Sequence, residues 1–120
     1  MKTFTLARVD GRNHQVPYWP IEVTIAGVDH IFALHMKDSS DYAVSDIRSG
    51  ASVLRRVHGE YKGMPCTTSG FTLNEVKLFA INQVHNIAIN IGAEKFNRVI
   101  AEVILDSDTK RQMEEHGVTA

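Results

Sequence analysis

Apolar and polar side chains alternate with a period of two through much of the first half of the chain. Residues 21–25 alternate Ile and Val with Glu and Thr, and residues 32–36 repeat the alternation after a turn at residues 26–29. This period is typical of strands that bury one face. A further strand is expected at residues 3–9, ending at the turn signal Asp10-Gly11.

Two more apolar runs, residues 42–47 and 51–58, lie on either side of Arg48-Ser49-Gly50 and predict a hairpin. Short connections join antiparallel neighbours. The strands within about residues 3–58 should therefore form an antiparallel meander of four or five strands. The glycine-rich segment 59–70 predicts a loop.

Tyr18 and Trp19 are enclosed by Pro17 and Pro20. Two prolines so close together exclude a central strand, because proline lacks the N–H that the ladder needs. In one interpretation the stiffened aromatic pair projects as an interface anchor, a role for which Tyr and Trp are favoured. In the other, Trp19 folds back over an open end of the core.

The order Thr72-Leu73-Asn74-Glu75 is a capping box. The Thr72 hydroxyl can accept from the Glu75 N–H, and the Glu75 side chain can reach back to the Thr72 N–H. Gly92 suits the backbone conformation that ends a helix. These signals predict a helix over about residues 72–91.

On a helical wheel, this segment has two apolar ridges. The first should pack on the sheet and comprises Leu73, Val76, Ala80, Val84, Ile87 and Ile91. The second lies to one side and comprises Leu78, Ile81, His85 and Ile89. The remaining arc carries amides in place of charges, namely Asn82, Gln83, Asn86 and Asn90.

So wide an apolar arc has two interpretations. The helix is central, with the sheet on one side and the next helix on the other, because wide apolar arcs are typical of buried helices. Alternatively, the second ridge and the amides form a protein interface, such as that of a two-fold dimer. Interface cores are depleted in charge and accept neutral hydrogen-bonding groups.

A second amphipathic helix is expected at about residues 94–105, with its apolar stripe at Phe96, Val99, Ile100, Val103 and Ile104. Asp106-Ser107-Asp108 should end this helix or cap a short third one, and residues 107–120 should form a flexible tail. The predicted fold class is α+β, with two or three helices packed on one face of the meander.

The composition is that of a single globular domain covering residues 1–120, with 43% apolar and 22% charged residues. A net charge of −1 gives no general attraction to nucleic acid or to an anionic membrane. No segment has the apolar length of a membrane span, and the first residues lack the apolar core of a signal peptide. The single cysteine, Cys66, excludes an internal disulfide and indicates a reducing, cytoplasmic setting.

The histidines do not have the spacing of a metal site. His30 and His35 are five residues apart and point to opposite faces of a strand, and no HExxH or paired CxxC motif exists. We therefore predict no metal, cofactor or catalytic site. A weaker alternative is a thiol enzyme in which Cys66 acts as nucleophile with a base such as His58. The six histidines are His14, His30, His35, His58, His85 and His116.

Residues 48–62 form a locally basic segment. Together with nearby tyrosines, its guanidinium groups could bind single-stranded nucleic acid on a sheet face. Asp41, Asp46 and Glu60 dilute the charge, so a solvated edge strand is the competing interpretation. The candidate contacts are Arg48, Arg55, Arg56 and Lys62.

These patterns favour a small non-enzymatic protein-binding module that self-associates or binds a protein partner. Its contacts would be the second ridge of the first helix and the Tyr18-Trp19 pair. Nucleic-acid binding is the alternative. In size and in its lack of a catalytic motif, the chain is similar to small accessory proteins of phages and mobile elements, including anti-CRISPR inhibitors of host defence complexes. That similarity covers no particular residues and implies only a role in binding and blocking.

Overall fold

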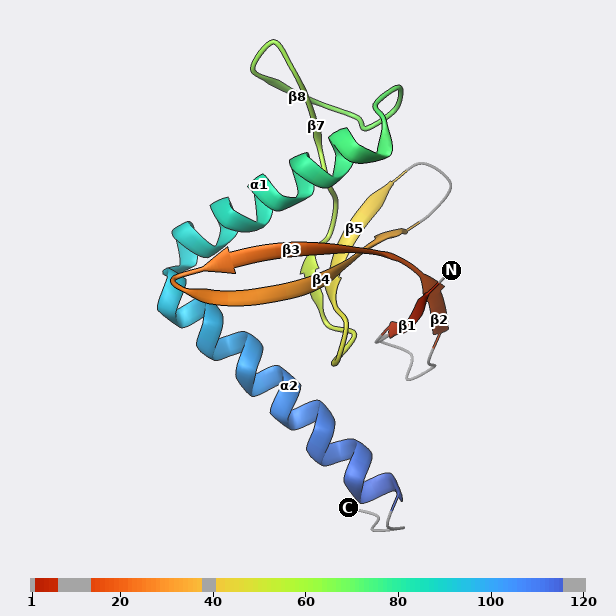
Figure 1. Cartoon of the computed structure of the whole chain (residues 1–120), viewed down its shortest axis with the longest axis vertical. Coiled ribbons are helices and arrows are strands. Elements are labelled where there is room, and N and C mark those ends of the chain that lie inside the picture. The colour runs from red at the N-terminus through yellow and green to blue at the C-terminus, as the bar shows by residue number, and fades with distance from the viewer. Residues whose placement is uncertain (1, 7–13, 38–40, 116–120) are drawn as a thin grey trace.

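The computed structural model describes residues 2–6, 14–37 and 41–115 (Figure 1). The strands in this part of the chain precede two helices, which confirms the predicted α+β class. The strands are β1 (Thr3–Leu6), β2 (His14–Pro17), β3 (Trp19–Ile25), β4 (Val28–Met36), β5 (Tyr42–Asp46), β6 (Ser52–Leu54), β7 (Gly59–Tyr61) and β8 (Met64–Cys66). The helices are α1 (Leu73–Ile91) and α2 (Ala93–Glu115).

The main sheet is an antiparallel meander of four strands in the order β3-β4-β5-β6, as the sequence predicts. Alternation along β3 and β4 turns Ile21, Val23, Phe32 and Leu34 to one buried face. β3 is an edge strand of this sheet and pairs only with β4. Pro20, which has no backbone N–H to donate, is tolerated in such a strand.

Two small hairpins accompany the sheet. β1 pairs with β2, a strand that the sequence does not predict, and the Asp10-Gly11 turn lies outside the described residues. β7 pairs with β8 inside segment 59–70, where the sequence predicts a loop. Lys62 and Gly63 at the tip of this second hairpin have φ of 51° and 77°. Positive φ at both central residues is typical of a tight hairpin turn, which explains the difference.

The strand predicted at residues 51–58 is shorter in the structure. β6 covers only Ser52–Leu54, and its pairing with β5 shifts in register between Val44 and Ser45. One further contact follows, in which the Val57 N–H donates to the Tyr42 carbonyl at 2.8 Å. The irregularity explains the interruption, because a bulge leaves neighbouring ladder hydrogen bonds unmade.

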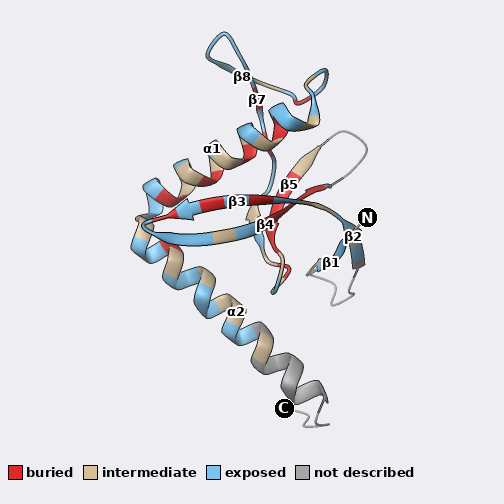
Figure 2. Ribbon diagram, in the orientation of Figure 1, coloured by how far each residue is buried: buried red, intermediate tan, exposed pale blue. Residues whose placement is uncertain are grey.

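The core lies between the sheet and α1 (Figure 2). Buried positions of α1 recur every four residues on the side that faces the sheet, and they are Val76, Ala80, Val84 and Ala88. Ile91, which is predicted to continue this ridge, is exposed. It lies in the final turn of α1, and Ala88 is the last residue of the helix that the core covers.

The opposite face of the sheet is covered at one end by the β1–β2 hairpin. Phe4 is buried there, with its ring centroid 5.1 Å from that of His35. His35 points away from α1 because its neighbour Leu34 points toward it. Away from the hairpin, this face carries the exposed residues Glu22 and Ile31.

α1 begins at the predicted capping box. The Thr72 hydroxyl accepts from the Glu75 N–H at 3.2 Å, and the Glu75 carboxylate accepts from the Thr72 N–H at 3.0 Å. Gly92 ends the helix with φ of 104°, and its N–H donates to the Ala88 carbonyl at 2.9 Å. The predicted bounds of this helix are confirmed.

α2 runs to Glu115, so the predicted end at residues 106–108 and the predicted flexible tail are wrong for residues 107–115. Asp and Ser disfavour a helix interior by only about 0.7 kcal/mol or less each, and most residues from 110 to 115 are strong helix formers. Residues 116–120, including His116, lie outside the described residues. Within the part of the chain that the structure describes, neither helix combines the length and apolar character needed to cross a membrane.

Candidate functional site

The side of α1 that is turned away from the sheet carries large apolar residues in contact with solvent. Leu78 is 62% exposed and Ile89 is 71% exposed. Asn82, which is exposed, and His85, which is half-buried, lie between them along the same side of the helix. We refer to these four residues as the outward face of α1. A surface helix normally turns charged or polar residues to water, so this face has the character of an interaction site.

The structure divides the predicted second ridge. Ile81 is half-buried and packs against the core, whereas Leu78 and Ile89 turn outward. Ile81 is therefore partly covered by the core of the monomer, whereas Leu78 and Ile89 are not. The exposed residues lie about half a helical turn away from the buried row that contacts the sheet.

α2 does not cover the outward face. Gly92 alone separates the two helices, which diverge from it in a V (Figure 1). α2 contacts the core near its start, through the buried Phe96 and the half-buried Ile100. Asn97 lies in the same part of α2. Its Nδ2 donates to the Ile25 carbonyl at 2.8 Å, and its Oδ1 lies 2.6 Å from His30 Nε2. These contacts hold the beginning of α2 at the β3–β4 hairpin and leave α1 open on its other side.

The lack of charged residues in α1 after Lys77 has a partial structural explanation. No Asp, Glu, Lys or Arg occurs between Lys77 and Glu94. The side-chain amide of Gln83 forms hydrogen bonds with both the backbone N–H and the backbone carbonyl of His58. The other amides of this arc, which are Asn82, Asn86 and Asn90, are exposed. Neutral exposed amides keep a surface polar without charge, as in the centres of protein interfaces.

Other exposed apolar residues lie on α2 and at the tip of the β7–β8 hairpin. Val99 and Leu105 are exposed on α2. Tyr61 and Met64 are exposed on the hairpin, which extends past the N-terminal end of α1, and the Lys62 ammonium lies 5.5 Å from the Tyr61 ring centroid. The sequence predicts a loop here and indicates Lys62 only as a nucleic-acid contact, so it does not predict an exposed apolar tip.

Tyr18 and Trp19 do not project from the structure. Tyr18 is half-buried, and its ring meets that of Phe4 edge-on at 5.6 Å. Trp19 packs against the core beside Tyr42, with ring centroids 6.1 Å apart. Trp19 thus folds back on the core, as the second interpretation predicts. Neither ring contributes to the outward face of α1.

The structure distributes the predicted nucleic-acid contacts over separate places. Arg48 forms an ion pair with Asp108 of α2, and Arg56 pairs with Asp41 at 3.0 Å. Arg55 is exposed after β6, and Lys62 lies at the tip of the β7–β8 hairpin. The four cations do not line one face, and two of them are paired with carboxylates.

Cys66 is half-buried at the end of β8, directly opposite Gly59. Its proposed base, His58, is exposed, and the backbone of His58 is held by Gln83. Among the described residues, no three His, Cys, Asp or Glu side chains gather closely enough to hold a metal ion. These placements add no catalytic or metal-binding geometry to the sequence patterns.

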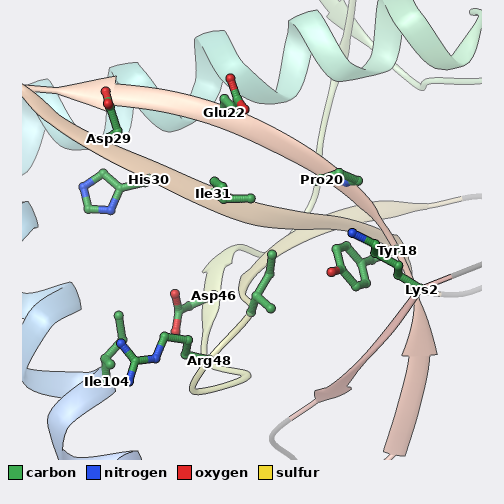
Figure 3. Close-up of a pocket in the computed structure, with 11 residues that line it drawn as sticks. Lys2, Tyr18, Pro20, Glu22, Asp29, His30, Ile31, Asp46, Arg48 and Ile104 are labelled. Atoms are coloured by element: carbon green, nitrogen blue, oxygen red, sulfur yellow. The ribbon is translucent and has the colours of Figure 1, made fainter.

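An open hollow of about 600 Å³ lies between the uncovered face of the sheet, the β5–β6 turn and α2 (Figure 3). Three of the polar residues at its rim, Arg48, Asp46 and His30, are engaged within the chain. Arg48 is paired with Asp108, and the Asp46 carboxylate accepts from both the N–H and the hydroxyl of Ser49 at 2.8 and 2.7 Å. His30 contacts α2 through Asn97. These bonds fasten the β5–β6 turn and α2 to the sheet and do not assemble a nucleophile with a base.

A serine–histidine pair that the sequence does not single out is buried in the sheet. With the imidazole proton on Nδ1, the Ser45 hydroxyl donates to His35 Nε2 at 2.9 Å, and Nδ1–H donates to the Met36 carbonyl at 3.3 Å. A nucleophile and its base have this relationship in hydrolases. Here both residues are buried, at 3% exposure or less, with Phe4 over the His35 ring. Substrate therefore has no access, and the pair is a hydrogen-bonded part of the core.

Burial lowers the pKa of His35 below its ordinary value of 6.5, and the hydrogen bond to the Met36 carbonyl opposes this effect. The imidazole is accordingly held neutral near pH 7. A neutral imidazole can accept a hydrogen bond from the Ser45 hydroxyl through Nε2, in agreement with the 2.9 Å contact of the pair.

The chain matches no known family model, no curated protein and no solved structure. The candidate site is therefore defined by the geometry and composition of the chain alone.

Proposed function

We propose that the chain is a small non-enzymatic protein-binding module, and that the outward face of α1 docks on another polypeptide. The observation that carries this proposal is the exposure of Leu78 and Ile89 on a helix side that carries no charged residue from Leu78 to Ile89. Both lie opposite the residues that bind α1 to its own sheet. The fold thus leaves α1 with one apolar side buried and a second apolar side without cover from the described residues.

Burial of the two exposed side chains would supply much of the binding free energy. Removing a Leu or Ile side chain fully from water contributes about 1.5–3 kcal/mol. The fraction already hidden in the monomer reduces that gain. No charge of the outward face has to be desolvated, which removes a common cost of association. Asn82 and His85 can form hydrogen bonds with a partner and so set the orientation of the contact.

A photo-reactive phenylalanine derivative in place of Leu78 tests the proposal in the cells that produce the protein. The same derivative in place of Glu22, which is exposed on the other face of the sheet, is the matched control. Illumination should give a covalent protein adduct from position 78 and much less from position 22. Failure to form an adduct at position 78, or equal adducts from both positions, would contradict the proposal.

A further inference from the structure

We infer that the polypeptide docked on the outward face is a second copy of the same chain, with the two α1 helices antiparallel about a two-fold axis. This inference rests on the proposed function and adds the partner and the register. The axis passes between Asn82 and His85. Leu78 of each subunit then meets Ile89 of the partner subunit, and Asn82 meets His85 of the partner subunit.

The spacing along the outward face reads the same in both directions. Asn82 follows Leu78 by four residues, His85 follows Asn82 by three, and Ile89 follows His85 by four. Eleven residues make about three helical turns, so Leu78 and Ile89 lie almost in line, roughly 16 Å apart. In a two-fold contact each residue faces its counterpart in reversed order. With the axis midway between Asn82 and His85, the mirrored spacing places each of the four residues opposite another of the four.

The residue types also match under this reversal. The apolar side chains at the two ends face each other, Leu78 against Ile89. The polar side chains in the middle face each other, and the Asn82 amide can donate to or accept from the imidazole of His85. Each buried polar group is then offered a hydrogen bond, which avoids the penalty of about 1–3 kcal/mol for leaving one unsatisfied. The two-fold axis produces this polar pair twice.

The absence of charge favours a second copy over a charged partner. Identical faces with a net charge repel each other, whereas residues 78 to 90 carry no charged side chain. A partner selected by charge finds no complementary group on this face. Antiparallel packing also brings the positive N-terminal end of each helix dipole near the negative C-terminal end of the other.

Disulfide trapping tests the register. Cys66→Ser removes the only cysteine of the chain, and Leu78→Cys and Ile89→Cys are made separately in that background. Mild oxidation of an equimolar mixture of the two variants should give the mixed covalent dimer as the main disulfide product. Each variant alone should give several-fold less dimer, because like positions stand roughly 16 Å apart along an antiparallel pair, too far for a disulfide.

Efficient dimer formation by each variant alone would indicate a parallel or unspecific contact and would overturn the inference. Complete absence of covalent dimer would also overturn it. The protein-binding role would survive either result if position 78 still gives a photo-adduct, and an adduct unlike two 13.4-kDa chains in mass would identify a different partner class. Loss of both the photo-adduct and the disulfide dimer would remove both proposals.

Discussion

The side-chain amide of Gln83 is hydrogen-bonded to both backbone polar groups of His58. Its Nε2 donates to the His58 carbonyl at 2.6 Å, and its Oε1 accepts from the His58 N–H at 3.0 Å. The amide thereby acts as a strand partner for the segment between β6 and β7. One polar residue of the neutral arc of α1 thus positions the chain next to the helix, while its exposed neighbours face solvent.

Replacement of Gln83 by Ala should lower the free energy of unfolding by about 1–3 kcal/mol, because two backbone groups lose their partner at once. Asn86→Ala is the matched control, since Asn86 is an exposed amide one turn further along α1. It should change stability by no more than about 0.5 kcal/mol. Urea unfolding followed by circular dichroism measures both, and equal effects of the two substitutions would contradict a structural role for Gln83.

Thr72→Ala should destabilise the protein by about 1 kcal/mol, because it removes the acceptor for the Glu75 N–H at the start of α1. Thr72→Ser keeps a hydroxyl at the same position and should retain most of the stability. The comparison is made by chemical denaturation at one pH. An Ala variant as stable as the Ser variant would show that the capping box contributes nothing measurable.

Gly59→Ala should destabilise the base of the β7–β8 hairpin. The added Cβ would lie 2.5 Å from the Thr67 carbonyl oxygen and 2.8 Å from a ring atom of Phe71. Overpacking of this kind costs about 1–3 kcal/mol. Gly63→Asn is the control, because that position is open and Asn tolerates positive φ. Thermal unfolding should show a clear loss for the first variant and little for the second; the reverse order would be inconsistent with this packing.

His35 should make the stability of the protein depend on pH. Its pKa is lowered in the folded state, so the unfolded chain binds the proton more readily. The free energy of unfolding should therefore fall as the pH drops below about 6.5, the ordinary histidine value, and should be insensitive to this group well above it. The described contacts of the ring are Ser45, the Met36 carbonyl and Phe4.

His35→Gln removes the titrating group and should flatten part of this pH dependence. The measurement is urea unfolding of wild type and variant at several values between pH 5 and pH 8. An unchanged slope in the variant would show that other groups cause the acid sensitivity.

Local signals predict the parts of this fold that depend on local interactions. The capping box at Thr72 and Glu75 sets the start of α1, and the alternation in residues 21–25 identifies a strand with one buried face. The tight turn at Lys62 and Gly63 is a weaker signal, since the surrounding glycines also fit a loop. The length of α2 is underestimated because Asp and Ser serve as caps in some contexts and as ordinary helix residues in others.

The candidate site is only partly predictable for a different reason. Helical spacing identifies Leu78, Ile81 and Ile89 as an apolar ridge, but the direction in which α2 leaves Gly92 decides which of them remain exposed. Gln83 has the same residue type as other amide positions on α1 and differs only in lying next to His58. Contacts between residues far apart in sequence are set by the packing of whole elements, and no local pattern encodes them.

Sedimentation equilibrium of wild type and of Leu78→Asp/Ile89→Asp tests the central claim most directly. Both positions are exposed in the protomer, so the double variant should stay folded, as circular dichroism can verify. Val28→Asp/Ile31→Asp, at exposed apolar positions of β4, is the control. A two-fold contact through the outward face predicts a mass of two 13.4-kDa chains for wild type and control, and of one chain for the outward-face variant. A wild-type mass of one chain at every concentration tested, or an undiminished dimer in the outward-face variant, would contradict it.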